Sequence, residues 1–233
     1  MGVRFSIGGP PVQTAARWLL TTALPTQERV GAVSSITHDF CITQAKEILW
    51  NDGFESEALQ VSFHHSSLSD GVRWIDQGWR NIAHYYHPVR DRGLFGGSHA
   101  VHEIGQYYRR ALRLFRRHKT DQAMFFLGAA CHFVQDLCVP HHAKCAIFSG
   151  HREFEQFAEE HRREYVVSCK GLYDKEKTPE SWVKENARIA YDWFTHVEGK
   201  NRSNYDRALQ TLLPLAQQTT AGFLKNFFDE AKK

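Results

Sequence analysis

Apolar residues recur along most of this chain at intervals of three and four, the spacing of one buried face of an α-helix. Between His38 and Trp50, for example, that face carries Cys41, Ala45 and Leu49. Alternating runs typical of strands are scarce. We therefore predict an all-α protein. Its helices are expected over residues 38–50, 70–86, 97–119, 120–139, 150–167 and 204–228, with a further helix beginning at 178.

The segment from Thr120 to Val139 is nearly all apolar after its first residues. A helix that is apolar on every side belongs in the centre of a bundle, and Pro140 would end it. Polar connections are predicted over 51–70 and 86–98. The length of 233 residues suits a single irregular multi-helix domain over 1–233, in which residues 1–30 form an N-terminal extension.

Charge and composition narrow the class of function. The net charge of +3 is too small to require a nucleic-acid partner, and no apolar run is long enough to cross a membrane. No convincing signal peptide precedes the first helix, so the sequence as it stands predicts a cytoplasmic protein. Five cysteines without a tight spacing pattern argue against a disulfide scaffold.

Fourteen histidines are more than a chain of this size usually carries, and several stand at metal-ligand spacings. His132 and Asp136 are four residues apart on the predicted central helix, and His151 and Glu155 repeat the spacing on the next one. Residues four apart share a helix face, and His142 lies where the chain turns between the two helices. Imidazole and carboxylate groups converging in this way suit zinc. The alternative is that His132 and Asp136 bond only to each other in the core.

Four segments carry a resemblance to a known family. They are THDFCITQAKEIL, QAMFFLGAACHFVQDLCVPHHA, GHREFEQFAEEHRREY and TAGFLKNFF. In these segments the chain resembles the bacterial zinc-dependent phospholipases C of the alpha-toxin type. The resemblance covers most of the chain, and it implies an all-α fold of the phospholipase C and P1 nuclease type.

The resemblance also implies a ligand set for two or three zinc ions. Its members here are His38, Asp70, His84, His132, Asp136, His142, His151 and Glu155. Asp70 is preferred to Asp76 because it stands fourteen residues before His84, a separation that the family uses. Asp70 is also expected to act in catalysis, by orienting or deprotonating the attacking water.

One ligand of the family has no counterpart. Secreted members hold a third zinc with the tryptophan at their mature N-terminus, whereas Trp18 stands twenty residues before His38. Either a side chain such as Glu28 replaces that ligand, or the site holds two ions. The chain is expected to be secreted, as family members are, if its true start differs from the first residue here. No calcium-dependent membrane domain is expected within this length.

The activity that the resemblance implies is cleavage of phospholipids to diacylglycerol and a phosphorylated head group, with transient contact at a membrane surface. A zinc nuclease of the P1/S1 type is the alternative enzyme, and only then would nucleic acid be a partner. Those nucleases close the site with His-x3-Asp, so Glu155 favours the lipase. A third hypothesis is a zinc-stabilised binding protein without turnover.

Overall fold

The computed structural model describes residues 27–174, 178–199 and 201–233, and the side chains before Ile36 lie outside that description. The described residues form helices and no β-strand, which confirms the all-α class. The α-helices are α2 (Gln27–Asn51), α3 (Glu55–Phe63), α4 (His65–Ile75), α5 (Ala100–Phe115), α6 (Thr120–Asp136), α7 (Pro140–Lys144), α8 (His151–His161), α9 (Pro179–Val197) and α10 (Arg202–Ala231). Three 3-10 helices complete the set: η1 (Gly78–His84), η2 (Leu94–Gly96) and η3 (Arg162–Tyr165).

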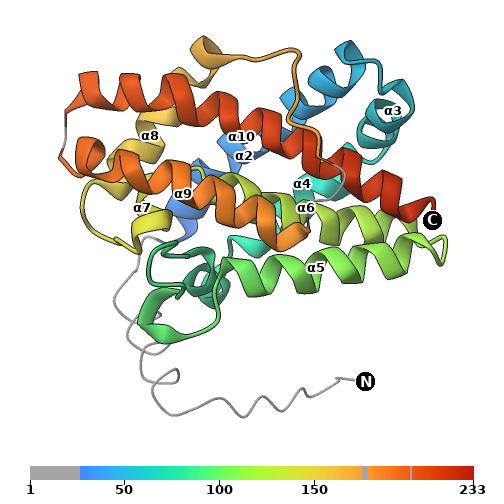
Figure 1. The fold of residues 1–233 in the computed structure, drawn as a ribbon, viewed down its shortest axis with the longest axis horizontal. Helices are drawn as coiled ribbons and strands as arrows, with labels where there is room; N and C mark the ends of the chain where they lie inside the picture. Colours follow the sequence, from blue (N-terminus) through green and yellow to red (C-terminus); the bar gives the residue numbers. More distant parts are fainter. Residues whose placement is uncertain (1–26, 175–177, 200) are drawn as a thin grey trace.

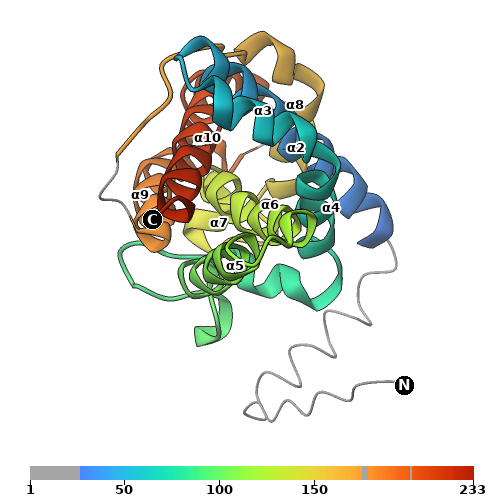
Figure 2. The same ribbon diagram turned by 90° about the vertical axis from the view of Figure 1, so that its right-hand side faces the viewer.

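Helix α6 is the central element that the sequence predicted. Figure 2 shows it near the middle of the bundle, with α2, α4, α5 and α10 around it. Its last ten residues, from Leu127 to Asp136, are all buried. Side chains on α6 therefore face protein on every side, and a polar group there must find its partner inside the bundle.

Helix α4 packs unusually close to α6. A Cβ atom on Gly71 would overlap the backbone carbonyl of Phe125, and one on Gly128 would overlap that of Leu68. Glycine is therefore required at both positions for the two backbones to meet. This contact brings the C-terminal end of α4 to the side of α6.

The structure corrects the helix predicted over 70–86. Helix α4 begins earlier, at His65, and ends at Ile75, after which the chain turns through Gln77 into the 3-10 helix η1. Gly78 has a φ of +68°, a conformation that side chains rarely adopt, and this residue breaks the helix. The break leaves Asp76 at the end of α4, close to the central helix.

The connection predicted over 51–70 is also corrected, because it contains α3 and the start of α4. Ala58 and Val61 of α3 are buried, so its short apolar face joins the core. The connection predicted over 86–98 is confirmed as a largely irregular segment, in which only η2 is helical. A backbone hydrogen bond of 3.2 Å from Tyr86 to His142 holds this segment against α7.

None of the helices in the described ranges is both long and apolar enough to cross a membrane. The helices share one buried apolar cluster, to which α2, α4, α5, α6, α8, α9 and α10 all contribute. Figure 1 shows α9 and α10 running along one side of α6, while α7 and α8 both lie toward the same end of the bundle.

Candidate metal centre

The central helix provides the middle of the site. His132 and Asp136 are both buried, and their four-residue spacing places them on the same face of α6. The Nε2 atom of His132 lies 3.1 Å from the Oδ2 atom of Asp136. The pair predicted from sequence spacing therefore exists, and it does not stand alone.

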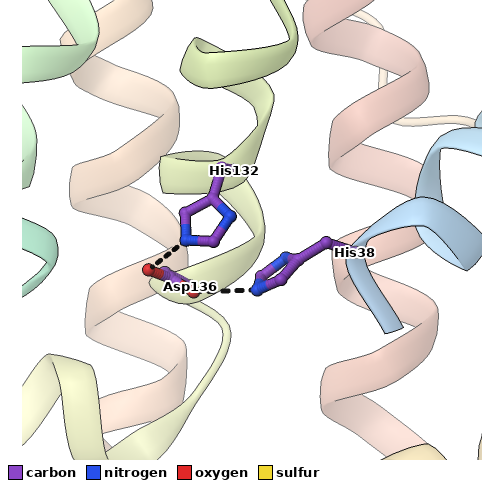
Figure 3. A group of neighbouring side chains, drawn as sticks. All are labelled: His38, His132 and Asp136. Atoms are coloured by element: carbon purple, nitrogen blue, oxygen red, sulfur yellow. Dashed lines mark ion pairs between the residues drawn. The ribbon is translucent and has the colours of Figure 1, made fainter. Parts of the chain in front are cut away.

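A third side chain reaches this pair from α2. His38 is buried, and its Nε2 atom lies 3.2 Å from the Oδ1 atom of Asp136 (Figure 3). Its ring lies 4.0 Å from that of His132, measured between centroids. His38, His132 and Asp136 can each offer a ligand atom within 4.8 Å of the others, which is close enough to hold one metal ion.

A second group shares His132 with the first. It consists of Asp76 at the end of α4, His84 at the end of η1, and His132. The Nδ1 atom of His84 lies 2.8 Å from Asp136 Oδ2, and Asp76 Oδ1 lies 4.0 Å from His132 Nε2. Asp136 therefore presents one oxygen to His38 and the other to His84, as a carboxylate that bridges two ions would.

A third group comes from α7 and α8. Its members are His142, His151 and Glu155. The Oε1 atom of Glu155 lies 2.9 Å from His151 Nε2 and 3.4 Å from His142 Nε2. The Nε2 atom of His142 is also 3.9 Å from Asp136 Oδ1, which joins this group to the other two. Pro140 begins α7, and the turn that follows α6 is what brings these groups together.

Of the eight residues that the sequence assigned as ligands, Asp70 alone lies outside these groups. It is on the exposed side of α4, with 57% of its side chain accessible to solvent, and Arg73 binds it at 2.6 Å. Asp76, the alternative to Asp70, is the aspartate that lies with His84 and His132. The preference for Asp70 assumed the separation of fourteen residues that the family uses, whereas the break at Gly78 brings Asp76 to His84 over only eight.

The replacement for the N-terminal tryptophan stays a prediction. Trp18 lies outside the described residues, and the side chain of Glu28 is not described either. The donors that the structure describes for the group around His38 are His38, His132 and Asp136.

Gln135 and His141 are two buried neighbours of the site, and the sequence analysis missed Gln135. Gln135 accepts a hydrogen bond of 2.7 Å from His38, and the ring of His141 stacks on His151 at 5.0 Å. His141 is held by a bond of 2.9 Å between its Nε2 atom and the carbonyl of Ser149. The signal for Gln135 was present, because an amide on the most apolar helix needs a buried partner.

Burial and neighbouring charges shift the pKa values of the ionisable groups in the cluster. Burial raises the pKa of Asp76 to about 6, although His84 opposes the shift, and burial lowers the pKa of His132 to about 3 against the pull of Asp136. Burial also opposes protonation of His38, but the hydrogen bond and charge of Asp136 outweigh it and raise the pKa of His38 to about 9. The pKa values of two neighbouring imidazoles are thus shifted in opposite directions within one buried volume.

The donor set fits zinc. Asp76 Oδ2 is buried without a hydrogen-bond partner among the described residues, as is His84 Nε2. Asp136 Oδ2 lies within 3.1 Å of two imidazole nitrogens, yet it makes no hydrogen bond of normal geometry with either. Buried carboxylate oxygens that approach nitrogens without proper hydrogen bonds are expected where a cation completes the arrangement. Imidazole and carboxylate are the ligands that zinc takes in catalytic sites.

Comparisons with known proteins also support a zinc site. The family model described as zinc dependent phospholipase C matches residues 37–208. A phospholipase C of Clostridium perfringens (strain 13 / Type A) is 24% identical over 84% of this chain and 59% of its own length. A phospholipase C of Listeria monocytogenes is 28% identical over 81% of this chain and 75% of its own length.

Among solved structures, an alpha toxin from Clostridium absonum shares the fold. It superposes with a TM-score of 0.77 at 20% identity, over 84% of this chain and 64% of the toxin chain. The chain thus spans about three fifths of the length of the first curated relative that it matches, at 59%. The matched part contains every residue of the three metal-binding groups, from His38 to Glu155.

Proposed function

The chain belongs to the zinc-dependent phospholipase C family, and from this membership we propose that it hydrolyses phospholipids to diacylglycerol and a phosphorylated head group. The observation that carries the proposal is the buried cluster in which Asp136 joins three groups of metal-binding side chains. A carboxylate shared in this way is suited to holding metal ions close to one another, which is the arrangement that phosphodiester hydrolysis uses.

Each group has its place in the proposed site. His38 and Asp136 would hold one zinc ion, Asp76, His84 and His132 with Asp136 a second, and His142, His151 and Glu155 a third, since the Nε2 atom of His132 can bind only one ion. Bound zinc would polarise the phosphoryl oxygens and lower the pKa of a nearby water molecule. The protein side chains would fix the positions of these ions from α2, α6, α7 and α8, and from the segment that joins the end of α4 to the end of η1.

Asp76 takes over the catalytic role first assigned to Asp70. Its Oδ2 atom is buried and has no hydrogen-bond partner in the described structure, so it can accept a proton from water at the site. The water oxygen would form a bond to phosphorus while the bond from phosphorus to the glycerol oxygen breaks. Removal of a proton by Asp76 turns the water into a nucleophile, and the same proton is then passed to the departing glycerol oxygen, which gives diacylglycerol and restores the carboxylate of Asp76.

The other two hypotheses are less well supported. Glu155 closes the third group within 2.9 Å of His151, whereas the P1/S1 nucleases have an aspartate at that spacing. The relatives found are phospholipases C. A binding protein without turnover would not need an arrangement in which one carboxylate joins every metal group.

Product analysis on short-chain phosphatidylcholine tests the proposal, with single-stranded DNA assayed in parallel. We expect phosphocholine and diacylglycerol from the full chain, and neither product from Glu155→Ala. Release of nucleotides without lipid turnover would instead support the nuclease hypothesis. Free choline would mean cleavage on the other side of phosphorus. Absence of turnover with both substrates would support the hypothesis of a zinc-stabilised binding protein.

We further propose that a surface beside the site contacts the membrane that holds the substrate. We call this surface the rim, and its members are Val89, Arg90, Arg92, Phe95, Lys144 and Phe148. Phe148 is 87% exposed and Val89 is 73% exposed, although both are large apolar side chains. Phe148 lies between His142 and His151 in the chain, so this member of the rim is connected through short segments to two ligands of the third metal group.

The rim also gathers positive charge. Burial lowers the pKa of His87, and the charges of Arg90, Lys144 and Arg92 lower it further. Arg92 is held against the C-terminal end of α7 through its carbonyl, which accepts a hydrogen bond from Cys145 at 3.8 Å. Exposed aromatic side chains with flanking cations are suited to a surface that contains anionic lipid.

Phe148→Ser should weaken binding to vesicles of phosphatidylcholine and phosphatidylserine by about 5- to 20-fold, because an exposed Phe side chain loses its apolar contact with lipid. Turnover of soluble short-chain phosphatidylcholine should stay unchanged. The matched control is Phe63→Ser, which removes a side chain 76% exposed at the end of α3, far from α7 in Figure 1. Equal vesicle binding by both variants and the unchanged protein would exclude this role for the rim.

A further inference from the structure

A chain of hydrogen bonds links α10 to the metal cluster through Gln135. This side chain is 3% exposed and lies on α6, directly before Asp136. Its Oε1 atom is 2.7 Å from His38 Nδ1, and its Nε2 atom donates to Thr220 Oγ1 at 3.2 Å. Gln135 therefore spans the space between α2 and α10.

The donor and the acceptor of each of these hydrogen bonds follow from Thr220, the last residue of the series. The hydroxyl of Thr220 donates to the backbone carbonyl of Ala216 at 2.6 Å, and a carbonyl can only accept. The single hydroxyl proton of Thr220 is therefore used, so its oxygen can only accept from Gln135. The amide nitrogen of Gln135 must face Thr220, and its carbonyl oxygen must face His38.

The same logic fixes the protons on His38. Because the carbonyl oxygen of Gln135 can only accept, the Nδ1 atom of His38 must carry a proton. In a neutral imidazole the proton on Nδ1 leaves a lone pair on Nε2. That is the atom that lies 3.2 Å from Asp136 and faces the first metal group.

We propose that Gln135 and Thr220 set the tautomer of His38, and that they thereby determine how tightly the metal position between His38 and Asp136 is filled. The inference rests on the proposed zinc site and adds to it the control of one ligand from outside the cluster. Gln135 acts as a positioning residue. Without Thr220 the amide of Gln135 could turn over, offer its NH2 group to Nδ1, and place the proton of His38 on the atom that must bind zinc.

The position of His38 explains why such control is needed here. His38 is the one residue of α2 among the metal-binding groups of the described chain, and it approaches a different oxygen of Asp136 from the one that His84 approaches. Partners that orient a ligating histidine commonly change metal affinity by about 10- to 100-fold. The cluster thus depends on α10, which supplies no ligand among the described residues.

The structure contains a matched control for Thr220. Thr219 is also buried on α10, its hydroxyl donates to the carbonyl of Leu215 at 2.7 Å, and it accepts a bond of 3.1 Å from the amide of Asn186. This is the same arrangement of carbonyl, hydroxyl and amide, but Asn186 ends on the carbonyl of Val134 and does not reach the metal-binding groups. Thr219→Val therefore measures how much zinc affinity changes when α10 loses a buried hydroxyl that has no link to His38.

The test compares Thr220→Val, Thr220→Ser and Thr219→Val in the full zinc-loaded chain. Competition with a chelator should show one zinc bound about 10- to 100-fold more weakly in Thr220→Val, with little change in the other two variants. Nitrogen-15 spectra of His38 should show a proton on Nδ1 in the unchanged protein and loss of that single state in Thr220→Val. If Thr220→Val does not fold, Gln135→Met should give the same loss of zinc affinity.

Unchanged zinc affinity in Thr220→Val, or an equal loss in Thr219→Val, would overturn the inference. A His38 Nδ1 atom without a proton in the unchanged protein would overturn it as well. Failure of the proposed function looks different, because it would appear as absent turnover of phosphatidylcholine in the unchanged protein, whereas the zinc affinities compared here do not depend on turnover. In that case the nitrogen-15 spectrum of His38 still decides whether Gln135 holds the proton on Nδ1.

Discussion

Asp136→Asn should remove at least one zinc ion and reduce phospholipase turnover by roughly 10³-fold. Asp136 places one oxygen 3.2 Å from His38 and the other 2.8 Å from His84, so its charge serves two of the metal groups at once. Asparagine keeps the shape of the side chain but has one neutral acceptor and an NH2 group in place of the second oxygen. Loss of several kcal/mol of metal-dependent stabilisation corresponds to that factor in rate.

The measurements are elemental analysis and turnover of short-chain phosphatidylcholine. Asp121→Asn is the control on the same helix, since Asp121 is exposed at the start of α6 and pairs with His64 at 2.9 Å. It should leave both zinc content and turnover unchanged. Full activity of Asp136→Asn would mean that Asp136 is a core residue and that the chemistry takes place elsewhere.

Asp76→Asn should lower turnover by at least about 100-fold, whereas Asp70→Asn should leave it within a factor of two. Asp76 is buried beside His132 with one carboxylate oxygen that lacks a hydrogen-bond partner, and asparagine can neither accept the proton from water nor contribute charge to the second metal group. Asp70 lies on the surface of the same helix, bound to Arg73, where a surface ion pair contributes little.

The two variants form a matched pair, because both change an aspartate of the same segment by one atom. Steady-state turnover and zinc content of the two purified proteins are the measurements. A large loss in Asp70→Asn together with normal activity of Asp76→Asn would restore the original assignment of Asp70. It would also show that the cluster around His84 is arranged differently in the working protein.

The contrast between Asp70 and Asp76 shows how far sequence reasoning reaches at this site. His132 and Asp136 could be predicted because both lie on one regular helix, where spacing alone fixes the shared face. The same holds for His151 and Glu155 on α8. Where a helix ends, the spacing of residues in the sequence no longer predicts which side chains lie close together.

Asp76 could not be chosen from spacing because the chain between it and His84 is not a regular α-helix. The positive φ of Gly78 turns the chain, and the 3-10 helix η1 then carries His84 back to the central helix. A periodic pattern of apolar residues continues through this break, so the pattern predicted one helix where two elements exist. The close packing at Gly71 and Gly128 that positions α4 is likewise a contact between distant segments.

The link through Gln135 depends on contacts at still longer range. His38, Gln135 and Thr220 come from α2, α6 and α10, and no local pattern joins them. Their relation appears only once three helices are packed around one core. A polar side chain within an apolar helix shows that a partner exists, but it does not identify the partner.

The measurement that tests this account most directly is the zinc content of the full chain, purified without chelators and determined by elemental analysis. The buried cluster should hold at least two zinc ions per chain, and the metal should return when the chelated protein is supplied with zinc, because its ligands are fixed by the folded core. A protein that holds less than one equivalent and cannot be reloaded would contradict the account.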